Sequence, residues 1–171
     1  MNELIEDVEL SYKLFEFAIR TMFYAELEFF DVERFGCDVQ LNLPEENVAY
    51  RVGNFTSNDA ITKASWMSVG VAFGSTAICL DCLLENVAST NPNLQVSKSL
   101  IAAVRNAFSH GIAAPRWHIK PHKIEVIDLS FIDAPKIDLS VLNGQVFDYS
   151  QIGGLAVWYR LKDYVIKNLA P

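Results

Sequence analysis

The first 35 residues contain neither proline nor glycine, and this uninterrupted run constrains the fold more than any other feature of the chain. Its apolar side chains recur close to the 3.6-residue period of an α-helix. They are Leu4, Val8, Phe15, Ile19, Met22 and Phe30. The sequence therefore predicts a long first helix over about residues 3–35. Phe17 and Tyr24 widen its apolar surface beyond one stripe, which indicates burial on two sides, against a partner subunit or inside its own bundle.

Two more long helices are predicted, over about residues 58–88 and 94–110. Gly70 and Gly74 are four residues apart in the first of these and create a smooth face on which another helix can pack closely. The nearly uncharged run 64–80 contains several hydroxyl side chains and falls short of the roughly 20 apolar residues that a membrane span needs. We therefore expect a buried core helix there.

The remaining segments have different patterns. Residues 36–57 contain Gly36, Pro44 and Gly53 and predict a long loop with little regular structure. Period-two alternation over about residues 116–148 predicts short strands. The expected strands are Trp117–Lys120 paired with Lys123–Asp128, then Lys136–Leu139 and Val146–Phe147. A last helix is expected over about residues 152–168.

Length, charge and cysteine content limit the classes of protein. A chain of 171 residues predicts one domain, and a net charge of −7 argues against a broad basic surface for duplex nucleic acid. An acidic start without a signal peptide and an odd cysteine count predict a cytoplasmic protein with reduced thiols. Cys79 and Cys82 have the spacing of half a zinc site without a second pair, so buried thiols are expected and neither a metal nor a cofactor is.

These observations predict a mainly α fold, a single helical bundle over residues 1–171 with a small antiparallel β-sheet insertion before the last helix.

The candidate for chemistry is the run Arg105-Asn106-Ala107-Phe108-Ser109-His110 at the end of the third long helix. Arg105 and His110 are five residues apart, so an ideal helix separates them by about 140° around its axis. Asn106 and His110, four apart, share a face. Arg105 and His110 can converge if the last turn unwinds at Gly111, or if a second copy of the helix faces the first across a two-fold axis.

An arginine–histidine set suits metal-free cleavage of an RNA phosphodiester. Arginine binds phosphate through a fixed fork of donors, and histidine can exchange a proton near neutral pH. The expected products carry a 2′,3′-cyclic phosphate and a 5′-hydroxyl. The simpler interpretation is a capped helix end, because cations in a last turn meet the negative end of the helix dipole. Gly111 would then end the helix in the left-handed conformation.

The motif resembles the R-x4-6-H motif of the HEPN superfamily, whose members are small helical bundles, many of them metal-independent endoribonucleases of toxin–antitoxin, abortive-infection and CRISPR systems. The motif, its place late in a helix and the long preceding helices carry this resemblance. It implies a homodimer in which two motifs form one cleft, RNA as substrate, and an antitoxin or other regulatory protein as partner. It also implies that Arg105 holds the phosphate, that His110 is the acid/base, and that Asn106 and Ser109 orient His110 or bind substrate.

A basic patch follows the motif. Arg116, Trp117, Lys120 and Lys123 could guide single-stranded RNA by charge and stacking, or form a solvated hairpin anchored by its tryptophan. Two alternatives to the ribonuclease remain open. One is a non-catalytic HEPN module that binds RNA, nucleotide or a protein partner. The other is a structural dimer in which Arg105 and His110 cap their own helix.

Overall fold

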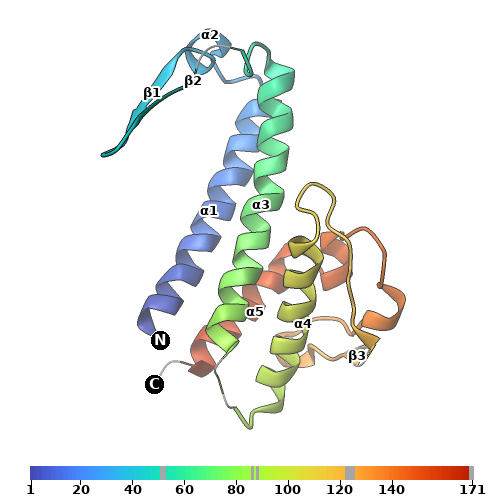
Figure 1. Ribbon diagram of the computed structural model, residues 1–171. Helices are drawn as coiled ribbons and strands as arrows, with labels where there is room; N and C mark the ends of the chain where they lie inside the picture. The colour runs from blue at the N-terminus through green and yellow to red at the C-terminus, as the bar shows by residue number, and fades with distance from the viewer. Residues whose placement is uncertain (51–52, 86, 88, 122–125, 170–171) are drawn as a thin grey trace.

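Two long antiparallel helices form the frame of the molecule. The computed structural model describes residues 1–50, 53–85, 87, 89–121 and 126–169. Helix α1 (Asn2–Glu26) lies along α3 (Asn58–Glu85), and this is the most extensive helix pair of the fold. Helix α4 (Pro92–Ser109) packs on α3, and α5 (Leu155–Leu169) lies behind them (Figure 1). The expected helical bundle is confirmed.

The first helix is shorter than predicted and ends at Glu26, not near residue 35. Glu28 adopts a left-handed conformation with φ of 56°, and the Phe29 amide donates to the Tyr24 carbonyl, which closes the helix end. Asp31 then caps the four-residue helix α2 (Val32–Phe35) by accepting a hydrogen bond from the Arg34 amide. This helix end has no sign in the sequence, because the left-handed residue is a glutamate and not the glycine that usually marks such an end.

Residues 39–50 form a hairpin within the segment where the sequence predicted a long loop with little regular structure, which corrects that expectation. Strand β1 (Val39–Asn42) pairs antiparallel with β2 (Asn47–Tyr50), with Val39 opposite Tyr50 and Asn42 opposite Asn47. Nearly every side chain in both strands is exposed. In Figure 1 the hairpin projects beyond the end of the α1–α3 pair. The register places Val39, Leu41, Val48 and Tyr50 on one face, and most of that face is exposed. Apolar and polar residues therefore alternate in the sequence, but each strand has only four residues, too few for the alternation to stand out.

Of the two glycines that were expected to form a smooth face on α3, Gly74 allows α4 to approach closely. A Cβ added at Gly74 would lie 3.0 Å from Cδ1 of Phe108, whereas one added at Gly70 would meet only the Ile112 carbonyl oxygen, at 3.4 Å. Helix α4 begins at Pro92 behind the Asn91 cap, two residues before the predicted start.

An aromatic cluster around Phe73 forms the centre of the core. The Phe73 ring is fully buried, and its centroid lies 4.8 to 5.5 Å from five other rings. These rings belong to Phe15, Phe108, Phe147, Tyr149 and Trp158. The cluster therefore joins α1, α3, α4 and α5 to the segment before α5. The Trp158 indole N–H donates to the buried Thr76 hydroxyl at 2.9 Å, which satisfies both polar groups.

The segment before α5 contains a small antiparallel sheet, as predicted, but with different partners. Strand β3 (Val126–Ile127) pairs with β4 (Ile137–Asp138). Residues 122–125 lie outside the described residues, so the predicted pairing of Trp117–Lys120 with Lys123–Asp128 is not fully described. Trp117 instead exchanges backbone hydrogen bonds with Gln145 and Gly144, and Arg116 forms a bridge with Val146.

A ten-residue repeat organises this segment. The tetrapeptide at residues 127–130 recurs at 137–140, and Phe147-Asp148-Tyr149-Ser150 is a third copy. In each copy the aspartate side chain accepts a hydrogen bond from the serine amide two residues later. A short 3-10 turn follows each aspartate, namely η2 (Ser130–Ile132), η3 (Leu139–Val141) and η4 (Tyr149–Ile152).

The last helix starts later than predicted. Gly153 and Gly154 both have positive φ, 83° and 89°, and separate η4 from α5, which begins at Leu155. Among the described residues, α3 is the one helix that is long and apolar enough to cross a membrane by length and composition alone.

The two glycines of α3 predict opposite responses to alanine. Gly74→Ala should lower the free energy of unfolding by about 1 kcal/mol, because crowding against Phe108 outweighs the gain in helix propensity. Gly70→Ala, the matched control, should raise it by about 0.5–1 kcal/mol. Urea denaturation measures both. Equal stabilisation by the two substitutions would contradict the close packing of Phe108 on Gly74.

The repeat also predicts acid sensitivity. The hydrogen bond from Lys136, and then those from Ser130, lower the pKa of Asp128 to about 2. Because the folded pKa lies below the unfolded value of about 3.9, this carboxylate stabilises the fold above that value. Its contribution is lost as the pH falls through the folded pKa. Between pH 5 and pH 2 the melting temperature should therefore fall less for Asp128→Asn than for the wild type, with Lys136→Gln in between. Identical pH dependence of all three proteins would refute this role.

Candidate active site

The predicted motif lies at the exposed end of α4. Helix α4 ends at Ser109, and His110 is its C-cap with φ of −101°. Gly111 is not among the glycines with positive φ, so the expected left-handed glycine cap is wrong. An added Cβ at Gly111 would meet only the Ala114 carbonyl oxygen, at 3.6 Å. The chain therefore leaves the helix in a conformation open to most residues, and His110 is exposed at the exit.

Arg105 is held by an ion pair within the chain. Its Nε and Nη2 atoms both donate to Oδ2 of Asp81 on α3, each at 3.0 Å. The Arg105 side chain remains 40% exposed and that of Asp81 21%. A guanidinium has five N–H donors, so this contact orients the group and leaves donors for a further anion. In the structural alternative, Arg105 would cap the end of its own helix. The observed contact is different, because the partner of Arg105 is a side chain on another helix.

The other polar residues of the motif differ in availability. The Ser109 hydroxyl donates to the Asn106 carbonyl at 3.0 Å, which satisfies it within the helix. Asn106 is half-buried, and its side chain lines a pocket beside Arg105. Asn106 is therefore better placed than Ser109 to contact a ligand.

The structure brings His118 to His110, a pairing that the sequence did not predict. The two imidazole rings have centroids 4.5 Å apart and are inclined at 75°. Both residues are exposed. In the sequence, His118 falls within the predicted strand Trp117–Lys120, eight residues beyond His110. Its position depends on the backbone bonds of Trp117 to residues 144 and 145, which no local pattern reveals.

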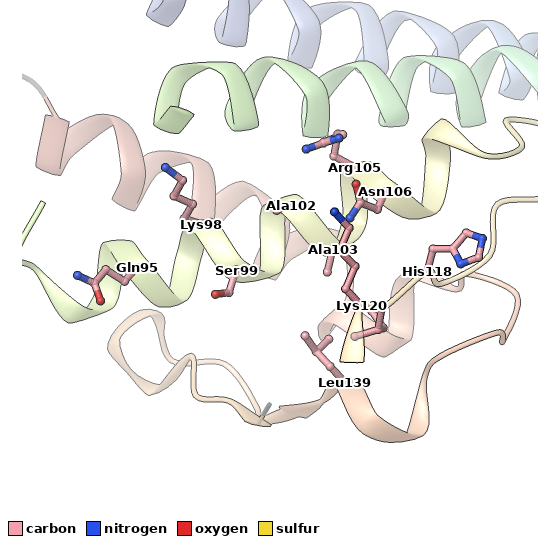
Figure 2. A pocket seen from close by; sticks show the side chains of 11 residues that line it. Gln95, Lys98, Ser99, Ala102, Ala103, Arg105, Asn106, His118, Lys120 and Leu139 are labelled. Carbon is pink, nitrogen blue, oxygen red and sulfur yellow. The ribbon is translucent and has the colours of Figure 1, made fainter. Parts of the chain in front are cut away.

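A pocket of about 480 Å³ opens between α4, residues 118–120 and Leu139 (Figure 2). Its cationic lining residues are Lys98, Arg105 and Lys120, together with His118. No aspartate or glutamate lines it among the described residues. The Lys98 ammonium donates to the carbonyls of Leu84 and Glu85 and so caps α3. Arg105, Lys120 and His118 are therefore the groups that can attract an anion into the pocket.

The predicted RNA-guiding patch is only partly available. Trp117 is fully buried, and its indole N–H donates to Oε1 of Gln151 at 2.7 Å, so it cannot stack on a base. Arg116 donates to the Gly144 carbonyl at 3.1 Å. Lys120 is exposed at the pocket, and Lys123 lies outside the described residues. The stacking role of Trp117 is thus corrected to that of a core anchor.

The cysteines are more exposed than predicted. Cys79 is half-buried, whereas Cys82 and Cys37 are exposed. Within the part of the chain that the structure describes, no three histidine, cysteine or acidic residues are grouped as metal ligands.

Comparisons with protein-family models, curated proteins and solved structures find no match to this chain.

The Arg105–Asp81 pair should contribute little to stability. A double-mutant cycle with Arg105→Gln and Asp81→Asn should give a coupling energy of about 0.5–1 kcal/mol, because partly exposed ion pairs are screened by solvent. Urea denaturation of the four proteins measures it. A coupling energy above about 2 kcal/mol would instead show that the main role of Arg105 is to stabilise the packing of α4 on α3.

Proposed function

We propose that this chain is a metal-independent endoribonuclease of the HEPN type that its Arg105–His110 motif resembles. The observation that carries the proposal is the His110–His118 pair, with ring centroids 4.5 Å apart. His118 also lines the pocket that contains Arg105, Asn106 and Lys120. Cleavage of RNA next to its 2′-hydroxyl needs one group to accept a proton and another to donate one, and two neighbouring histidines can supply both.

The proposed reaction is an internal transfer at phosphorus. One histidine accepts the 2′-hydroxyl proton as the 2′-oxygen attacks the adjacent phosphorus. The bond from phosphorus to the 5′-oxygen breaks, and the other histidine delivers a proton to that oxygen. The products are a 2′,3′-cyclic phosphate and a 5′-hydroxyl. The donors of Arg105 that Asp81 leaves free would stabilise the charge that develops on the phosphoryl oxygens.

RNA binding would rest on the local pocket and not on the overall charge. The net charge of −7 repels a polyanion at long range. The pocket lining combines Lys120 with the amide side chains of Gln95 and Asn106, and its volume of about 480 Å³ is within the usual range for small-molecule sites. We expect it to hold one nucleotide of a single strand beside the histidines.

The biological setting is proposed from the resemblance. It implies a defence or toxin–antitoxin role, a homodimer, and a regulatory protein such as an antitoxin as partner. In the homodimer that the HEPN resemblance implies, two motifs form one cleft. In the present proposal one chain holds both histidines, so the acid and the base need not come from different subunits.

The second candidate is a non-catalytic module that binds RNA or a nucleotide through the same pocket. The Arg105–Asp81 ion pair favours it, because Asp81 occupies two of the guanidinium donors and partly neutralises their charge.

Cleavage of RNA in EDTA separates the two candidates. The purified protein should cut single-stranded RNA and leave cyclic phosphate ends. His110→Ala and His118→Ala should each lower kcat/KM by about 100-fold to 10,000-fold. Arg105→Ala should also lower kcat/KM, because it removes the donors that stabilise charge on the phosphoryl oxygens. Arg34→Ala, at an exposed arginine of α2, is its matched control and should keep wild-type activity. RNA that binds the wild type without being cut would support the non-catalytic module.

The pH dependence provides the control for the two histidine roles. The wild type should show a bell-shaped profile of kcat/KM, and His118→Ala should lose one limb of the bell. Unchanged activity in His118→Ala would remove this residue from the mechanism and leave His110 without its proposed partner.

A further inference from the structure

The outer faces of α1 and α3 carry two parallel rows of apolar side chains without a partner in the described fold. The rows follow the three- and four-residue spacing that places side chains on one helix face. Their large members are between 45% and 67% exposed. They are Leu10, Leu14 and Phe17 on α1 and Met67, Val71 and Ile78 on α3. We call this surface the α1–α3 face.

The α1–α3 face has both projections and a hollow. The residues that line the hollow, such as Thr21 and Ala64, are uncharged, and the exposed Lys13 lies at the border of the α1 row. An apolar groove of about 440 Å³ runs between the two helices, with Ala18 and Ala72 in its lining. The Phe17 side chain stands at its edge and is 67% exposed. One surface thus presents a bulky ring and a groove walled largely by small residues.

The size of the α1–α3 face approaches what a stable dimer needs. Six large side chains, each about half exposed, present on the order of 600 Å². The smaller residues between them bring this toward the roughly 800 Å² that each partner buries in a standard interface. Soluble monomers seldom expose contiguous apolar patches larger than a few hundred Å².

We propose that a second copy of this chain docks on the α1–α3 face about a two-fold axis, so that two helices from each copy form a four-helix bundle. In a two-fold interface each surface must complement itself, and here Phe17 of one copy can enter the groove of the other. Two adjacent rows with heptad-like spacing are the half-site of such a bundle. Because the groove at the centre of the face has no charged lining residue, it meets its own copy without like-charge repulsion, whereas a charged segment of another protein would find no complementary group there.

This interface does not depend on the proposed ribonuclease activity. The His110–His118 pair lies beyond α4, and no residue of the motif belongs to the α1–α3 face. Asp81, one helical turn after Ile78, places the Arg105 ion pair near its border. The face therefore differs from an interface formed by the motif itself.

Sedimentation velocity of the full chain tests the proposal. The wild type should sediment as a dimer at micromolar concentration. Phe17→Glu and Val71→Glu should each raise the dimer dissociation constant by about 1,000-fold, because the two-fold axis repeats each charge in the interface. Val141→Glu, at a 61% exposed valine in η3, is the matched control and should leave the dimer intact. Melting temperatures establish that every variant is folded, and Leu10→Glu replaces any that is not.

Three outcomes would overturn the proposal. The first is a wild-type protein that is still monomeric at 100 µM. The second is a dimer that persists in both Phe17→Glu and Val71→Glu. The third is binding of a monomeric wild type to phosphatidylcholine vesicles that these substitutions abolish, which would assign the face to a lipid surface.

Discussion

The packing of aromatic rings on Phe73 is the interaction on which the rest of the structure depends. This ring joins Phe15 of α1, Phe108 of α4 and Trp158 of α5. Phe147 and Tyr149 complete its surroundings. Each contact belongs to an element far away in the sequence. Edge-to-face and tilted ring pairs have preferred geometries, so they fix orientation as well as proximity. Gly74, next along α3, lets Phe108 come close enough to join the cluster.

The same cluster positions the candidate site. Phe108 lies two residues before His110, and its ring centroid is 5.0 Å from that of Phe147. Phe147 in turn packs on Trp117, the residue before His118, at 5.3 Å, and its amide donates to the Pro115 carbonyl. The two histidines therefore meet because their neighbours are anchored in one core. Rigid supporting residues of this kind give catalytic side chains a fixed geometry.

Local patterns predicted the helical bundle, the close approach at Gly74 and the motif at the end of α4, since helical periodicity and glycine spacing are local properties. Local patterns failed where the structure depends on an unusual backbone conformation, on very short strands, on side-chain hydrogen bonds or on tertiary contacts. Glu28 ends α1 without glycine, and the hairpin strands at residues 39–42 and 47–50 are too short for their alternation to stand out. The aspartate–serine turns at Asp128, Asp138 and Asp148 depend on side-chain hydrogen bonds, which apolar periodicity does not reveal. The pairing of His110 with His118 depends on tertiary contacts through Trp117, and no residue spacing encodes it.

The central claim is that one chain holds both histidines of the site, while copies of the chain associate elsewhere. Subunit mixing tests it most directly, with His110→Ala and His118→Ala chains combined after each is shown to be folded and inactive. A site within one chain predicts that the mixed dimers cleave RNA no faster than either variant, beside an active wild type. Recovery of a substantial fraction of the wild-type rate on mixing would show that the site is shared between subunits and would contradict the account.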